Sequence, residues 1–105
     1  MSESHQTLTN EQAIDLAVQH QTAGRLRQAE NIYRRILQKH PNQPIALHLL
    51  GVIAHQKREN DKAVDLINRA LAIEPDYAEA HNTLGNALMA LGRAEEAVTS
   101  YRKTL

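Results

Sequence analysis

The chain has 105 residues, of which 42% are apolar and 23% are charged, with twelve basic and twelve acidic side chains. This length suits one domain or a few short repeats, and the balanced charge gives no electrostatic reason to expect nucleic acid or an anionic membrane as a partner. The lack of cysteine excludes disulfides, thiolate nucleophiles and cysteine-based zinc sites. A polar N-terminus, and apolar runs far shorter than the ~20 residues of a membrane span, favour a soluble, cytoplasmic protein.

Six helices are predicted in chain order. Residues 1–9 are expected to form a disordered leader, at whose end Thr9 forms a capping box with Gln12. The predicted helices cover residues 11–22, 27–39, 45–57, 62–73 and 77–91, and a sixth begins near 95 and continues to 105. Asn42 and Asp76 are the expected caps of the third and fifth helices. The connections are short, so neighbouring helices should be antiparallel.

The chain also repeats itself every 34 residues. Such a period indicates stacked copies of one supersecondary unit, each too small to bury its own apolar face. We divide the chain into units at 10–43, 44–77 and 78–105, the third one cut short. The recurring positions are Leu16, Leu50 and Leu84; Ala17, Gly51 and Gly85; Ala29, Ala63 and Ala97; and Pro41 and Pro75.

These units resemble the tetratricopeptide repeat (TPR) family, whose pattern includes a large residue, Leu followed by Gly or Ala, a further Ala and an aromatic residue. The third unit carries this pattern as His81, Leu84-Gly85, Leu88, Ala97 and Tyr101. The resemblance implies an all-α, right-handed superhelical solenoid of three helix-turn-helix repeats. The run AEAHNTLGNALMALGRAEEAVTSYRKTL further resembles the N-terminal TPR array of bacterial O-GlcNAc-transferase-like proteins, in which such an array precedes a glycosyltransferase.

In TPR stacks the first helices of successive units line a concave groove, and the resemblance places the partner-binding residues there. An apolar patch with polar edges is typical of a contact surface, although packing between repeats is an alternative interpretation. The amides of Asn82 and Asn86 either bond a peptide backbone or are simply solvated. The predicted partner-binding residues are Asp15, Val18, Thr22, Ile45, His48, Leu49, Val52, His55, Gln56, Asn82, Asn86 and Met89.

This surface predicts a protein–protein interaction scaffold that binds an extended or helical peptide through apolar contacts and amide hydrogen bonds. Chaperone-binding TPR domains grip a terminal carboxylate with Lys, Arg and Asn, whereas the matching positions here hold Asp15, Leu49 and Thr83. A carboxylate clamp of that type is therefore not expected. Two alternatives are a substrate-recruiting arm of a larger glycosyltransferase-type enzyme and a self-assembling module.

No catalytic residue, metal site or cofactor is predicted. His48 and His55 are seven residues apart, roughly 10.5 Å along a helix, which is too far for two ligands of one zinc ion. His20 occupies a position expected to pack in the core. The sequence has no Gly-rich phosphate loop, no GxSxG and no cysteine nucleophile, so we do not expect an enzyme.

The last helix is expected to leave part of its apolar face bare, because terminal repeats normally need a polar outer face. The chain is expected to be a fragment of a longer array, or copies associate into a homo-oligomer through this helix, and the two explanations are compatible. The predicted self-association residues are Ala97, Val98, Tyr101 and Leu105.

Overall fold

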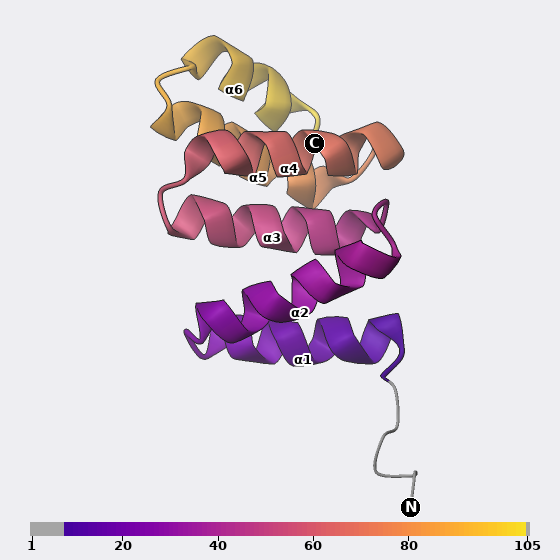
Figure 1. The fold of residues 1–105 in the computed structure, drawn as a ribbon. Coiled ribbons are helices and arrows are strands. Elements are labelled where there is room, and N and C mark those ends of the chain that lie inside the picture. Colours follow the sequence, from indigo (N-terminus) through magenta and orange to yellow (C-terminus); the bar gives the residue numbers. More distant parts are fainter. Residues whose placement is uncertain (1–7, 105) are drawn as a thin grey trace, which may run out of the picture.

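The computed structural model describes residues 8–104, which fold into six α-helices arranged as three stacked antiparallel hairpins (Figure 1). The predicted all-α solenoid is thereby confirmed. Most of the predicted leader, residues 1–7, lies outside the described residues, as does Leu105. The helices are α1 (Asn10–Thr22), α2 (Leu26–Lys39), α3 (Pro44–Gln56), α4 (Asn60–Ile73), α5 (Ala78–Ala90) and α6 (Ala94–Arg102).

The helix ends follow local chemistry, with two corrections to the sequence prediction. The capping box at Thr9 and Gln12 is confirmed, with bonds of 2.9 and 3.1 Å between each side chain and the other residue's backbone N–H. Asn42, however, is not the cap of α3, because the Gln43 side chain accepts from the Ile45 N–H at 2.7 Å. Tyr77, not Asp76, occupies the N-cap position of α5 and offers no side-chain cap.

The final helix is also shorter than predicted. α6 ends at Arg102, and Lys103 and Thr104 form a turn, whereas the apolar spacing predicted a helix still running at residue 105. The Thr104 hydroxyl donates to the Tyr101 carbonyl at 2.7 Å, so it satisfies one of the carbonyls that a helix end leaves free.

Each hairpin turns through one residue with a left-handed backbone. These residues recur with the period of 34: Gly24 has φ of 83°, Arg58 of 64° and Gly92 of 78°. A positive φ is unstrained for glycine and costs free energy in a residue with a Cβ atom. The second hairpin therefore makes with arginine the turn that the other two make with glycine.

Within a hairpin, a glycine on the first helix lets a larger side chain of the second helix approach. A Cβ atom on Gly51 would lie 2.7 Å from Ile67 Cγ1, and one on Gly85 would lie 2.7 Å from Tyr101 Cδ1.

The buried side chains form two clusters, one centred on the first hairpin and the start of the second, the other on the second and third hairpins. The recurrent leucine differs between units: Leu50 and Leu84 are 8% exposed, but Leu16 is 38% exposed.

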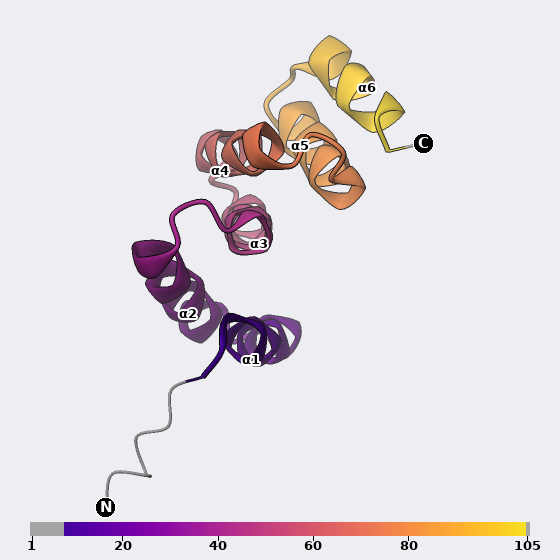
Figure 2. The same ribbon diagram turned by 90° about the vertical axis from the view of Figure 1, so that its right-hand side faces the viewer.

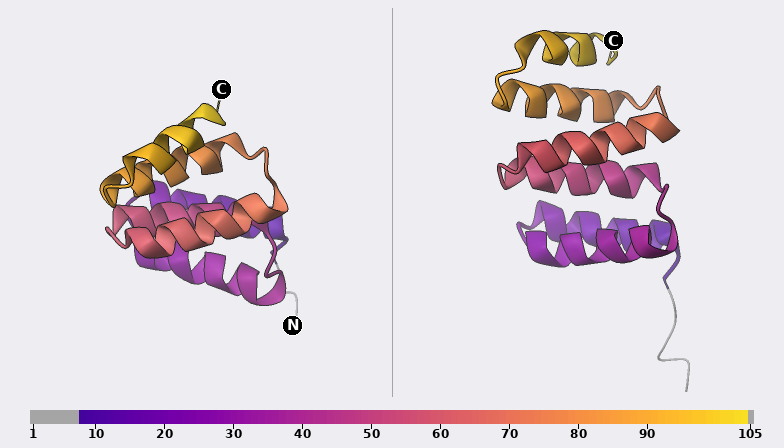
Figure 3. Two further views of the ribbon diagram at one scale, coloured as in Figure 1. Left: turned by 90° about the horizontal axis from the view of Figure 1, so that it is seen from above. Right: turned by 45° about the horizontal axis from the view of Figure 1, so that its top comes forward.

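The hairpins stack so that the second helix of one covers the first helix of the next. α2 packs on α3, α4 packs on α5, and α3 also contacts α5 directly. Seen along the helices, α1, α3 and α5 follow one side of the stack, while α2 and α4 follow the other (Figure 2). The right-hand view of Figure 3 shows the helices stacked from α1 and α2 at the lower end to α6 at the upper end. The exposed sides of α1, α3 and α5 thus form one surface, which we call the first-helix surface.

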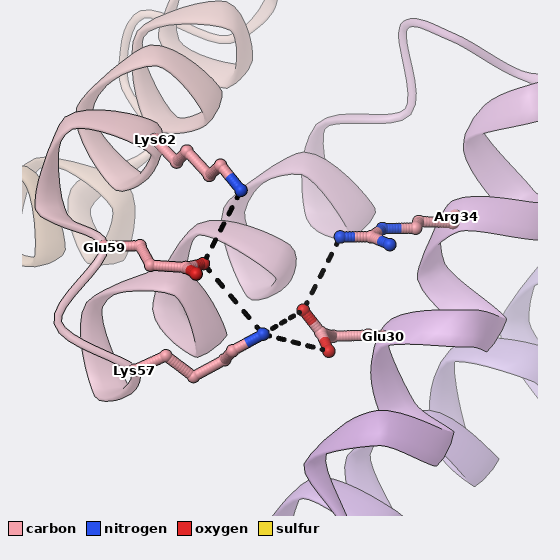
Figure 4. Close-up of polar contacts among 5 residues, drawn as sticks. All are labelled: Glu30, Arg34, Lys57, Glu59 and Lys62. Carbon is pink, nitrogen blue, oxygen red and sulfur yellow. Dashed lines mark hydrogen bonds and ion pairs between the residues drawn. The ribbon is translucent and has the colours of Figure 1, made fainter.

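On the opposite side, an ionic cluster joins the first two hairpins (Figure 4). The Lys57 ammonium lies 3.2 Å from Glu30 Oε2, and Arg34 and Glu59 extend the cluster at 3.6 and 3.9 Å. The Glu30 side chain is only 13% exposed, so it depends on these cations more than a fully solvated carboxylate does. Among the described residues, no helix is both long and apolar enough to cross a bilayer.

Candidate functional site

The first-helix surface exposes one large apolar side chain from each hairpin. Val18 on α1 is 38% exposed, Ile45 on α3 is 41% exposed and Met89 on α5 is 52% exposed. Leu49 and Val52, half-buried, continue the apolar strip along α3. Spacings of three and four residues put Ile45, Leu49 and Val52 on one side of the helix. The buried Leu47, Leu50 and Ala54 occupy the other side.

Polar side chains surround this strip, and two of them already have partners within the chain. The side chains of Asp15, Thr22, Gln56 and Asn82 are exposed. Asn86 is exposed too, but its Oδ1 accepts a hydrogen bond of 2.6 Å from the Tyr101 hydroxyl. His55 is half-buried, and its Nδ1 donates to Asn60 Oδ1 at 2.6 Å. Asn86 and His55 therefore have fewer free hydrogen-bonding groups for a partner than the sequence predicted.

His48 does not lie on the open surface, contrary to the sequence prediction. It is 5% exposed and sits where α3 meets the third hairpin. Its Nδ1 lies 3.0 Å from the Tyr77 hydroxyl and its Nε2 lies 2.9 Å from Thr83 Oγ1. The Tyr77 ring also meets the imidazole edge to face, with centroids 4.9 Å apart. Both ring nitrogens are thus occupied, and His48 joins two hairpins.

The Thr83 hydroxyl also contacts the Glu79 carbonyl at 3.1 Å, and a carbonyl oxygen can only accept. With its single hydrogen on that carbonyl, the hydroxyl accepts from His48, so we assign the imidazole proton to Nε2. In this tautomer Nδ1 accepts from the Tyr77 hydroxyl. Burial lowers the pKa of His48, with the Glu79 carboxylate acting weakly in the opposite direction. Burial likewise raises the pKa of Tyr77 to about 12, together with the nearby carboxylates of Glu79 and Glu74.

No local sequence pattern signals this contact, because Tyr77 and Thr83 lie 29 and 35 residues after His48. Residues that far apart meet only once the hairpins stack. Another histidine also differs from expectation: His20 is half-buried, not packed in the core, and its Nδ1 accepts from Arg25 Nε at 2.9 Å. Within residues 8–104, no three histidine or acidic side chains are placed to hold a metal ion.

The predicted self-association face is mostly covered by the chain itself. Ala97 is fully buried against α5, which corrects the expectation that it would be partly bare. Tyr101 is half-buried, with its ring against Gly85 and its hydroxyl bonded to Asn86. Only Val98, 46% exposed, remains as an open apolar side chain among the described members of this set.

The comparisons with known proteins agree with this architecture. The chain matches the tetratricopeptide repeat family over residues 14–78 and again over residues 54–103, so it belongs to that family. It is 45% identical over 56 residues to the peroxisomal targeting signal receptor of Candida albicans, covering 53% of this chain and 10% of that protein. It is 34% identical over 88 residues to a probable UDP-N-acetylglucosamine–peptide N-acetylglucosaminyltransferase of Arabidopsis thaliana, covering 82% of this chain and 9% of that protein. The chain thus spans a small part of the curated relatives it matches.

Two solved structures extend the comparison. An O-GlcNAc transferase mutant of Thermobaculum terrenum superposes with a TM-score of 0.86 at 33% identity, covering 95% of this chain and 20% of that one. The first TPR domain of Spaghetti (RPAP3), bound to the HSP90 peptide SRMEEVD, also has a TM-score of 0.86, at 21% identity, covering 91% of this chain and 76% of that one. The second likeness concerns the fold alone. The chain is therefore a TPR module of the protein-interaction class, similar to the TPR arrays of O-GlcNAc-transferase-like proteins.

Proposed function

We propose that the chain binds a peptide segment of a partner protein along the first-helix surface. One observation carries the proposal: Val18, Ile45 and Met89, one from each hairpin, are large apolar side chains left 38–52% exposed. Apolar side chains gathered on one face and edged by polar residues are typical of an interaction site. A ligand that runs along the stack would meet all three hairpins.

The charge of this surface limits the kind of peptide. α1, α3 and α5 contain no lysine and no arginine, whereas Glu11, Asp15 and Glu79 are exposed carboxylates on α1 and α5. A surface of this sign attracts cationic ligands and repels anionic ones. The proposed ligand therefore has apolar side chains at its centre and basic residues at its ends.

Two of the similar proteins support a peptide ligand of some kind. The Candida protein is by name a receptor for a targeting signal, and the Spaghetti domain is bound to a peptide. That peptide, SRMEEVD, is acidic and suits a basic groove. Since the first-helix surface here is acidic, we do not expect this chain to share that ligand.

A second function, recruitment of protein substrates for a glycosyltransferase, has a specific observation in its favour. The chain is 33% identical to a TPR-containing O-GlcNAc transferase over 95% of its length. The same first-helix surface would then hold part of the acceptor polypeptide. In that case, binding of a peptide here would compete with glycosylation of that acceptor by the complete enzyme.

The direct test is binding of peptides selected from a random displayed library, measured by fluorescence anisotropy. Val52→Glu and Leu49→Glu should each weaken the selected peptide at least about tenfold, because a carboxylate would replace an apolar contact. Ile73→Glu is the matched control, since Ile73 is 39% exposed but lies at the end of α4. SRMEEVD serves as the negative probe. Selection of acidic peptides, or equal weakening by Ile73→Glu, would contradict the proposal.

A further inference from the structure

At the two ends of the described solenoid some side chains are exposed, whereas the residues at the equivalent positions of the inner repeats are buried. Leu16 is 38% exposed, whereas Leu50 and Leu84, at the same place in the next two units, are 8% exposed. At the other end Val98 is 46% exposed, whereas Val64, one repeat earlier, is 8% exposed. The residue types are the same at the compared positions, so the difference arises because no described hairpin lies beyond Leu16 or beyond Val98.

The internal junctions show what kind of neighbour covers these positions. One hollow of 270 Å³ lies between α2 and α4, with Leu50 of α3 in its lining, and another of 240 Å³ lies between α4 and α6, with Leu84 of α5. Every residue that lines the second hollow stands 34 positions after one that lines the first. The two junctions between hairpins thus have the same structure. At the second junction Val64 packs in the same cluster as Leu84.

We infer that a second copy of this chain continues the stack, with α6 of one copy covering α1 of the next. Val98 and the partner's Leu16 then stand in the relation that Val64 and Leu84 have inside the chain. A hollow of 460 Å³ already lies beside Leu16, with Leu8, Ile32 and Ile36 in its lining. The contact joins two different faces, so it is head-to-tail and builds open chains, not closed dimers.

Like charges face each other at the junction between two copies, and they weaken it. In the first internal hollow Arg34 faces the same space as Glu59, and in the second Asn68 shares the space with Arg93. The equivalent residues between two copies are Arg102 and the partner's Arg25. Two like charges weaken the contact, and salt screens their repulsion. The association should therefore be weak and should strengthen as salt is raised.

Sedimentation velocity of the 105-residue chain at about 1 mM should show concentration-dependent oligomers that grow with added salt. Leu16→Asp and Val98→Asp should each abolish association. A 1:1 mixture of the two variants should form a dimer and nothing larger, because only the intact α6 of the first and the intact α1 of the second can join. Val18→Asp is the matched control, since Val18 is as exposed as Leu16 on the same helix but lies on the first-helix surface. Circular dichroism checks that each variant folds.

Three different results would overturn the proposed association. A wild-type chain that stays monomeric at this concentration overturns the inference. If Val98→Asp abolishes association but Leu16→Asp does not, two α6 helices pair with each other and the head-to-tail contact is wrong. A 1:1 mixture of Leu16→Asp and Val98→Asp that stays monomeric would also show that the head-to-tail contact is wrong. None of these outcomes depends on whether a peptide binds to the first-helix surface.

Discussion

The Tyr77 hydroxyl donates a hydrogen bond to His48 Nδ1 at 3.0 Å and so ties the second hairpin to the start of the third. The opposite ring nitrogen donates to Thr83, so a neutral imidazole bridges two units of the stack. Interfaces between neighbours provide much of the stability of a repeat protein. This contact therefore couples the folding of the second hairpin to that of the third, and it makes the coupling sensitive to protons.

We predict that the free energy of unfolding falls as the pH drops below about 6.5. Because the pKa of His48 is lowered in the folded chain, the unfolded chain binds more protons in this range. The contribution is fully present above pH 6.5 and is lost as the pH falls toward the lowered folded pKa. Urea unfolding between pH 5 and 8, compared with His48→Gln, isolates the effect from the other histidines. Parallel curves for the two proteins would falsify this role.

Removal of the Tyr77 hydroxyl should also destabilise the chain. Tyr77→Phe keeps the ring against the imidazole but leaves His48 Nδ1 buried without a donor, at a cost of about 1–2 kcal/mol near pH 7. Thermal unfolding measures the loss. Tyr101→Phe is the comparison, because its hydroxyl bonds to the exposed Asn86, where water can replace it. An equal loss in both variants would show that burial of the hydrogen bond is not what matters.

The two helix glycines should respond differently to alanine. The added Cβ at Gly51 would lie 2.7 Å from Ile67 Cγ1. Because Ile67 is fully buried and a β-branched side chain on a helix has essentially one χ1 rotamer, the gain of about 1 kcal/mol in helix propensity offsets only part of this clash. At Gly85 the added Cβ meets the rigid Tyr101 ring, and we expect a net loss of about 1–3 kcal/mol. Chemical denaturation of both variants tests this order, and a reversed order contradicts it.

Arg58→Gly should stabilise the chain by about 0.5–1 kcal/mol. Arg58 has φ of 64° where the other two hairpins use glycine, and removal of its Cβ relieves that strain at some cost in unfolded-state entropy. Gly24→Ala and Gly92→Ala should have the opposite sign. Since no atom lies within 4 Å of a Cβ at either glycine, any loss of stability there reports the backbone alone. The three variants are compared by their melting temperatures.

Glu30→Ala should cost about 0.5–1 kcal/mol and make stability less dependent on salt. Glu30 is the largely buried member of the ionic cluster, and its loss leaves Lys57 and Arg34 without their shared carboxylate. Glu59→Ala, which removes a more exposed carboxylate at 3.8–3.9 Å from its lysines, should cost less. Unfolding at low and high salt distinguishes the two, and an unchanged salt dependence in Glu30→Ala would argue against the cluster.

The sequence by itself determined the helices, their order and the positions that recur every 34 residues. These features are local: apolar spacing, glycine at turns and the Thr9–Gln12 capping box depend on residues a few positions apart. The same repetition showed which residues to compare between units. It did not reveal that Leu16 lies open while Leu50 is covered, since an identical residue is buried only where a neighbouring hairpin exists.

Only the tertiary structure decided which predicted surface residues are free. His48 has the spacing of a groove residue, yet its stacked neighbours Tyr77 and Thr83 enclose it, while Ala97 is sealed against α5. Val18, Ile45 and Met89 remain open because no element of the described stack covers them. The physical reason is the same in each case. Helical periodicity assigns a side chain to a face, but its burial depends on contacts with residues of other helices, which form only when the helices pair into hairpins and the hairpins stack.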